Sequence, residues 1–200
     1  MKTVAKIFVG SGILATVLLL GRFLYFAPNN EIDSGLFVSS QNTGGTTINS
    51  SSTDLPVKLL IPKLEIDTDV QHVGVTKSGN MAAPNNFVDV GWWKYGTIPG
   101  EKGSAVMAGH EDNALSLDGV FKRLGDLEKG DDVYVVDKSG EKKHFRVIDT
   151  EIYPYNDAPL DKIFHTDDSS YLVLITCAGD WIPEAKTNDK RLVVYAELVE

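Results

Sequence analysis

The chain has 200 residues, with 19 basic and 28 acidic side chains, which is enough for one domain of ordinary size plus appendages. Its net charge of −9 argues against nucleic acid as a partner, because phosphate contacts need clustered Lys and Arg. With a single cysteine, Cys177, the chain forms no internal disulfide, so its stability has to come from a packed core.

The first 27 residues predict a membrane anchor. An uncharged run, 7–21, follows two lysines, and a helix from Ile7 to Ala27 would rise about 31 Å, enough to cross a hydrocarbon core. No small-x-small cleavage site stands near Ala27, which favours an uncleaved anchor over a cleaved secretory peptide. The lysines place the N-terminus in the cytoplasm and the rest of the chain outside the cell membrane.

Residues 28–54 predict a flexible extracellular linker. The run Ser39–Thr53 is rich in Ser, Thr, Asn and Gly and has one apolar residue, so it cannot bury a core. An apolar patch, Gly35–Val38, interrupts this polarity, and we interpret it as an inert juxtamembrane segment, the alternative being a patch that rests on the domain.

Residues 55–200 predict one folded domain rich in strands. Two segments favour helix, Gly119–Leu127 and Leu160–Phe164, and Lys138–Glu141 is typical of a hairpin turn. Seven or eight strands with little helix indicate a closed or nearly closed β-barrel. The expected strands are Val57–Ile61, Val70–Val75, Gly103–Ala108, Asp132–Val136, Lys143–Ile148, Tyr171–Ile175 and Leu192–Leu198.

The domain shows no pattern for a bound cofactor or metal. It has no internal repeat, no glycine-rich phosphate loop and no pair of Cys or His at metal-ligand spacing. Its acidic loop residues have no spacing typical of a calcium cage, so we interpret them as solvated charge. We therefore expect neither a metal nor a cofactor.

Cys177 follows an apolar strand, Tyr171–Ile175, and precedes a turn. A thiol at the exit of a strand is held by a rigid element and is still within reach of a substrate. The alternative is a buried cysteine that acts as a small hydrophobic side chain.

A reactive cysteine needs a partner that helps to form the thiolate and later donates a proton, and histidine suits both tasks. His144 lies in an alternating strand, and His72 and His165 lie in polar loops. His110 differs, because it follows a strand of small residues and so repeats the position of Cys177 at a strand exit. The pattern therefore favours His110 as the partner.

Arg191 opens the last strand, after the loop that follows Cys177. A permanent cation with several N–H donors suits the negative oxygen that forms when a thiolate attacks a carbonyl. The alternative is a surface charge at the start of a strand.

Three short motifs occur in one order along residues 55–200, and together with the anchor they resemble the sortases, membrane-anchored cysteine transpeptidases of Gram-positive-type bacteria. The motifs are Ala108-Gly-His-Glu-Asp112, Leu174-Ile-Thr-Cys177 and Asp189-Lys-Arg-Leu-Val-Val-Tyr-Ala196. Supporting stretches are Leu60-Ile-Pro62, Val90-Gly-Trp-Trp93, Pro99-Gly-Glu-Lys-Gly103 and Val120-Phe-Lys-Arg-Leu124.

The resemblance implies an eight-stranded sortase β-barrel with one or two short helices. It implies that Cys177 attacks the Thr–Gly bond of a Leu-Pro-x-Thr-Gly-like sorting signal, that His110 protonates the departing amine and that Arg191, with Thr176 nearby, supports the oxyanion and binds substrate. The partners implied are surface proteins that carry the sorting signal and an amine acceptor, either a cell-wall peptide or a pilin lysine.

Among sortase subclasses the motifs are most similar to the class E/F group. Val173 stands where many housekeeping members have threonine, and Asp33–Phe37 lacks the proline of the pilin-type lid. Two other interpretations remain: another cysteine peptidase of the cell wall, and a membrane-tethered extracellular β-barrel that binds without catalysis and keeps Cys177 inert.

Overall fold

The computed structural model describes residues 33–37, 53–112, 117–164 and 168–199. The expected anchor, most of the expected linker and His165 lie outside these ranges. Within them, no helix has the length and apolar character needed to span a bilayer.

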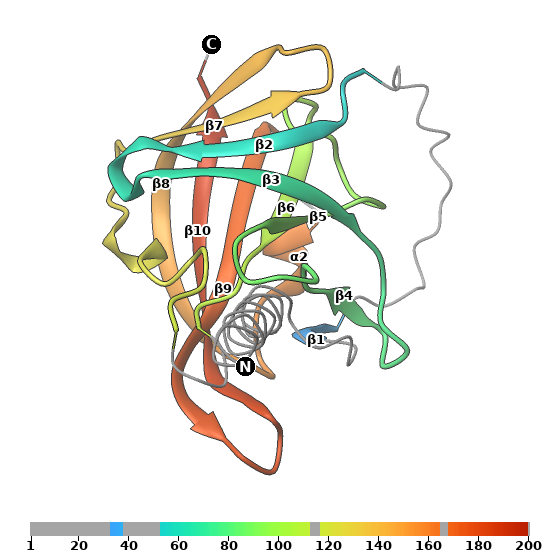
Figure 1. Ribbon diagram of the computed structural model, residues 1–200, viewed down its shortest axis with the longest axis vertical. Coiled ribbons are helices and arrows are strands. Elements are labelled where there is room, and N and C mark those ends of the chain that lie inside the picture. Colours follow the sequence, from blue (N-terminus) through green and yellow to red (C-terminus); the bar gives the residue numbers. More distant parts are fainter. Residues whose placement is uncertain (1–32, 38–52, 113–116, 165–167, 200) are drawn as a thin grey trace, which may run out of the picture.

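Eight strands close into a barrel, which confirms the predicted fold (Figure 1). Their order around the barrel is β10, β8, β7, β2, β3, β5, β6 and β9. The neighbours β3–β5 and β6–β9 are parallel, and the other paired neighbours are antiparallel. The strands are β2 (Pro56–Ile61), β3 (Ile66–Val73), β5 (Val90–Trp93), β6 (Gly103–Ala108), β7 (Asp132–Asp137), β8 (Lys142–Pro154), β9 (Ser170–Ile182) and β10 (Thr187–Leu198).

Two short strands lie beside the barrel. β1 (Asp33–Phe37), inside the stretch that we interpreted as linker, pairs antiparallel with β4 (Asn80–Ala82). The apolar residues at 35–37 therefore belong to a strand whose backbone is paired with the domain.

The barrel interior holds the main core. Strand residues alternate between the two faces of a sheet, and one of the two sets on each strand packs inside. On β7, for example, Val133 and Val135 are buried while their neighbours are only half-buried. The interior set from the strands is Leu59, Ile61, Val90, Trp92, Ala105, Met107, Val133, Val135, Phe145, Val147, Leu172, Leu174, Val194 and Ala196.

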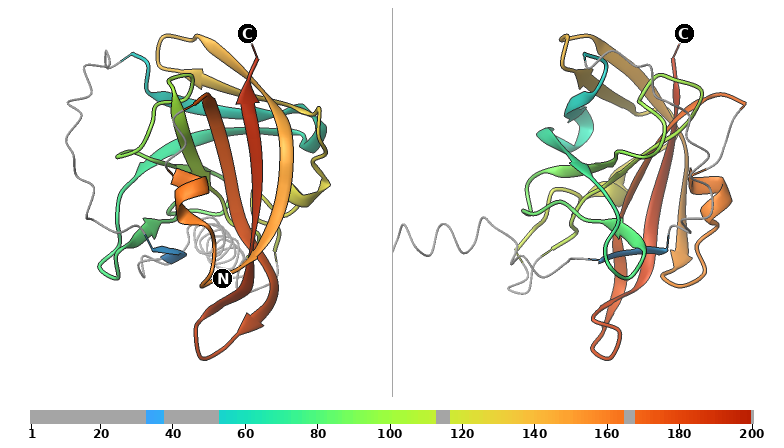
Figure 2. Two further views of the ribbon diagram at one scale, coloured as in Figure 1. Left: turned by 180° about the vertical axis from the view of Figure 1, so that it is seen from behind. Right: turned by 90° about the vertical axis from the view of Figure 1, so that its right-hand side faces the viewer.

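A second apolar cluster covers the outer face of β6, β9 and β10. The short helix α2 (Leu160–Phe164), which the sequence predicted, places Ile163 against this face (Figure 2). This covering explains why β6 and the first half of β9 read as continuous apolar runs rather than alternating ones. The outer set on the three strands is Val106, Ala108, Val173, Ile175, Val193 and Tyr195.

The helix predicted at Gly119–Leu127 is wrong. The segment forms turns, and only the 3-10 helix η3 (Leu124–Asp126) is regular. The N–H groups of Gly119, Val120 and Phe121 donate to the carbonyls of Glu111, Phe87 and His110. Further along, the N–H groups of Leu124 and Leu127 donate to carbonyls three residues back, whereas an α-helix bonds four residues back.

The hairpin turn between β7 and β8 is confirmed. The N–H of Gly140 donates to the carbonyl of Asp137 at 3.0 Å, and Gly140 has a φ of 89°. Glycine adopts this left-handed conformation without the steric cost that a Cβ brings.

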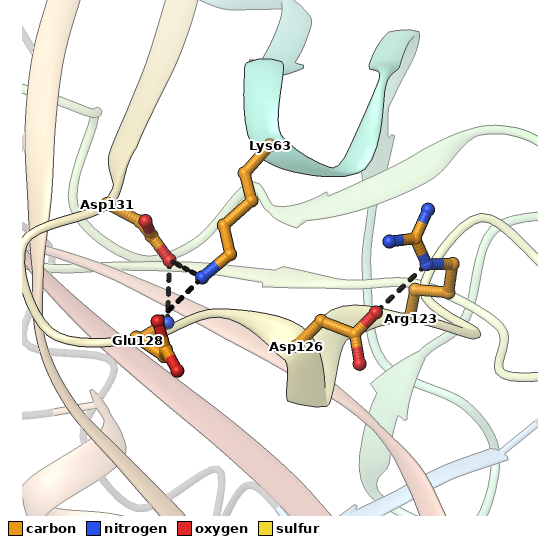
Figure 3. A network of polar contacts seen from close by, with 5 residues as sticks. All are labelled: Lys63, Arg123, Asp126, Glu128 and Asp131. Atoms are coloured by element: carbon orange, nitrogen blue, oxygen red, sulfur yellow. Dashed lines mark hydrogen bonds and ion pairs between the residues drawn. The ribbon is translucent and has the colours of Figure 1, made fainter.

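Ion pairs at the surface link the loops at the barrel's edge (Figure 3). Lys63, in the 3-10 helix η2 (Pro62–Leu64), donates to Glu128 at 3.0 Å and to Asp131 at 2.8 Å. Arg123 pairs with Asp126 at 2.9 Å. Exposed pairs of this kind contribute little to stability, so the two apolar clusters hold the fold together.

The interior core predicts a large effect of Phe145→Ala. Phe145 on β8 is fully buried, so the substitution should lower the free energy of unfolding by about 3–5 kcal/mol. Ile152→Ala on the same strand is the control, since Ile152 is 60% exposed and its removal should have a small effect. Denaturant unfolding of both variants measures the difference, and equal losses would contradict the assignment of the core.

Candidate active site

Strand pairing brings Cys177 and Arg191 directly opposite one another. Cys177 on β9 and Arg191 on β10 are Cα partners in the antiparallel pair. Directly opposite residues in such a pair have Cβ atoms about 5 Å apart. The thiol is half-buried, and the arginine is almost fully buried.

His110 leaves β6 at the level of Cys177 on β9. The parallel register ends with Ala108 opposite Ile175. Two hydrogen bonds continue it: the N–H of Gly109 donates to the carbonyl of Ile175 at 3.1 Å, and the Thr176 hydroxyl donates to the carbonyl of Gly109 at 2.9 Å. His110, just past the end of β6, is therefore level with Cys177. The turn expected directly after Cys177 is wrong, because β9 continues to Ile182 and Cys177 lies within the strand.

Cys177 and Arg191 fall on the same face of the sheet, and His110 follows just past the end of β6. Ala108, Ile175 and Val193 lie in the outer cluster, and Cys177 and Arg191 stand two positions away from Ile175 and Val193 along their own strands. Because successive side chains alternate between faces, a step of two residues returns to the outer face.

Thr176 lies between these positions and is buried. Its hydroxyl donates to the carbonyl of Gly109 and so ties the residue after the end of β6 to β9. The structure thus gives Thr176 a clear structural contact, and its expected contact with substrate stays a prediction.

Burial keeps the imidazole of His110 neutral. The ring packs against Phe87 with 4.8 Å between centroids, and Nε2 lies 3.1 Å from the carbonyl of Pro84. Desolvation lowers the pKa of His110, opposed by the Pro84 hydrogen bond and by the charge of Asp112. In the neutral ring, Nε2 donates to the Pro84 carbonyl, which leaves Nδ1 as a proton acceptor.

Burial also keeps the thiol of Cys177 protonated. Desolvation raises the pKa of Cys177, and the nearby carboxylates of Glu111 and Asp112 raise it further. The guanidinium of Arg191 acts in the opposite direction. The resting site therefore holds a thiol and a neutral imidazole.

The guanidinium of Arg191 is bound by the hairpin that connects β9 to β10. Its Nη1 donates to the carbonyls of Lys190 at 2.8 Å and Asn188 at 3.1 Å, and Nη2 donates to the Thr187 hydroxyl at 2.7 Å. Its Cζ also lies 5.9 Å from the centroid of the Tyr155 ring. No pattern in the sequence predicted these partners.

The other described histidines lie elsewhere. His72 belongs to β3, not to a loop as expected, and Nε2 bonds the carbonyl of Pro56 at 2.8 Å. His144 on β8 bonds Asp132 at 2.7 Å and stacks on Tyr134. Across the described part of the chain, no group of three or more His, Cys, Asp or Glu side chains is arranged to hold a metal ion.

The sequence matches the Sortase domain family over residues 59–199, nearly the whole barrel. The chain belongs to the sortase family. It is 31% identical to Sortase D of Bacillus subtilis (strain 168) over 111 residues, which are 55% of this chain and 50% of that protein. The chain thus spans about half the length of this curated relative.

Solved sortase structures share the fold of this sortase. Sortase C-1 from Actinomyces oris superposes with a TM-score of 0.56 at 23% identity, covering 72% of this chain and 73% of that one. A lid mutant of sortase A from Corynebacterium diphtheriae has a TM-score of 0.56 at 20% identity, with coverage of 73% and 70%. The resemblance to class E/F stays a prediction, since these relatives are named sortases A, C and D.

The electrostatics of this sortase predict a weakly acidic thiol. The rate at which iodoacetamide alkylates Cys177 follows the thiolate fraction. The inflection of this rate against pH should therefore lie above 9.0, the ordinary pKa of a cysteine thiol. Because Cys177 is the only cysteine, the label is unambiguous.

Two variants test the causes of this pKa shift. Arg191→Met should move the inflection to higher pH, because the cation that favours the thiolate is lost. Glu111→Gln should move it to lower pH, because an opposing negative charge is lost. An inflection in the wild type below pH 8 would contradict the burial of the thiol.

Proposed function

We propose that this sortase is a membrane-anchored cysteine transpeptidase that acts outside the cell. The observation that carries the proposal is the register of β6, β9 and β10, which supports a shared role for a thiol, an imidazole and a guanidinium at one level of the sheet. The substrate is a surface protein with a Leu-Pro-x-Thr-Gly-like sorting signal, cleaved between Thr and Gly.

In the first step, Cys177 and His110 exchange a proton. The neutral imidazole takes the thiol proton, and the thiolate attacks the Thr carbonyl carbon. Arg191 stabilises the oxyanion that forms. The C–N bond then breaks, and the imidazolium gives its proton to the departing glycine amine, which leaves a thioester on Cys177.

In the second step, an acceptor amine attacks the thioester carbonyl. A C–N bond forms, the C–S bond breaks, and the proton released by the amine returns through His110 to the thiolate. The acceptor is an amine of a cell-wall peptide or a pilin lysine. No second thiol is present in the chain to trap Cys177 as an internal disulfide.

Cleavage of a fluorogenic sorting-signal peptide tests the proposal. Cys177→Ala should abolish turnover, because the nucleophile is lost, and His110→Ala should lower kcat by at least about 100-fold. His144→Ala is the matched control, since His144 lies at the far end of β8 from Tyr153, the residue opposite Arg191, and should keep near wild-type rates. Turnover retained by Cys177→Ala would reject the proposal.

The pH dependence of kcat/KM should be broad. Activity needs one proton shared by the thiol and the imidazole. The pH dependence of kcat/KM reports the pKa values of these groups in the free enzyme. The rate should fall as pH drops through the lowered pKa of His110, below 6.5, and again as pH rises through the raised pKa of Cys177, above 9.0. A fall in kcat/KM well inside the range from 6.5 to 9.0 would contradict the assignment of His110 and Cys177 as the titrating pair. The charged groups that act on this pair are Arg191, Glu111 and Asp112.

A further inference from the structure

The hairpin between β9 and β10 extends beyond the barrel (Figures 1 and 2). β9 continues past Cys177 to Ile182, and β10 returns from Thr187, its pairing partner. The two strands that carry the thiol and the guanidinium therefore form both the wall of the barrel and this projection.

A bulge fixes the base of the hairpin. The pairing register shifts between Asn188 and Lys190, which sets Asp189 outside the regular ladder. Oδ1 of Asp189 accepts the N–H of Asp180 at 2.8 Å, and its carbonyl accepts the N–H of Tyr155 at 3.0 Å. The backbone around Arg191 is thus held from two sides.

The bulge turns three acceptors toward the guanidinium. Two are the backbone carbonyls of Asn188 and Lys190, and the third is the side-chain hydroxyl of Thr187, which accepts the shortest of the three bonds at 2.7 Å. A guanidinium is planar, so acceptors on both Nη atoms fix the orientation of the plane as well as its position. Thr187 lies four residues from Arg191, nearer the tip of the hairpin.

We propose that Thr187 is a positioning residue, whose hydroxyl orients the guanidinium of Arg191 beside Cys177 and links the hairpin to turnover. The proposal rests on the oxyanion role of Arg191 proposed above. A conformational change at the hairpin moves Thr187, and through its hydroxyl the hairpin sets how well the guanidinium meets the developing charge.

Thr187→Val removes the hydroxyl and keeps the shape of the side chain. In the full-length enzyme it should lower kcat for the sorting-signal peptide about tenfold with little change in KM, because a misplaced group loses transition-state contact. Thr187→Ser keeps the hydroxyl and should restore kcat to within about twofold of the wild type.

Thr68→Val is the matched control. The Thr68 hydroxyl is also hydrogen-bonded, donating to the carbonyl of Val88 at 2.5 Å, but it lies on β3, away from Arg191. It should alter thermal stability and leave kcat unchanged. An equal loss of kcat in both valine variants would overturn the proposal, since it would show a general effect of a lost hydroxyl.

Alkylation of Cys177 gives a second measurement, which does not depend on turnover. If Thr187 holds the guanidinium near the thiol, Thr187→Val should move the pH inflection of alkylation upward, in the direction of Arg191→Met. In the Arg191→Met background, Thr187→Val should have no further effect on either measurement, as a double-mutant cycle requires for a residue that acts through another.

The outcomes separate this proposal from the proposed function. Normal turnover in Arg191→Met would reject the oxyanion role, and the alkylation series would still decide whether Thr187 holds the guanidinium. A large loss in Arg191→Met with wild-type behaviour of Thr187→Val would overturn the role of Thr187 alone. A rise of kcat in Thr187→Val would also overturn it, because the hydroxyl would then hold the guanidinium away from the reaction.

Discussion

The register of three adjacent strands is the constraint on which the site depends. β6 and β9 run parallel and β9 and β10 antiparallel, and their register brings His110, Cys177 and Arg191 to one level. A slip of one residue would send a side chain to the barrel interior. Two apolar clusters oppose such a slip, because β9 is buried on both faces, with Leu174 inside and Ile175 outside.

The burial that fixes this geometry also determines the protonation of the site. Desolvation raises the pKa of Cys177 and lowers that of His110, so both groups rest uncharged. Charging them requires moving one proton from sulfur to nitrogen, with no exchange of protons with water. The guanidinium of Arg191 favours the thiolate and the carboxylate of Glu111 opposes it, which makes the balance between these two neighbours a determinant of reactivity.

The sequence was sufficient to predict the barrel and the end of β6 at Ala108, because both follow from local patterns of apolar residues and turns. It placed Cys177 and Arg191 at strand ends, whereas β9 continues to Ile182 and β10 already begins at Thr187. It was not sufficient at Gly119–Leu127, where apolar spacing predicted an α-helix and the backbone instead forms turns, tied to the rest of the fold by bonds such as that from the Val120 N–H to the Phe87 carbonyl. The partners of Arg191 were missed for a similar reason. They arise from a bulge at Asp189, and bulges depend on how two strands are paired.

Arg191 connects two parts of the fold, the barrel wall and the hairpin that projects from it. The barrel must be rigid to hold Cys177 and His110 in register, whereas the hairpin projects from it. The guanidinium starts from a barrel strand, opposite Cys177, and is bound by acceptors of the hairpin, including Thr187. A shift of the hairpin would therefore move the acceptors that hold a charge beside the thiol, which links the projection to the site through one side chain.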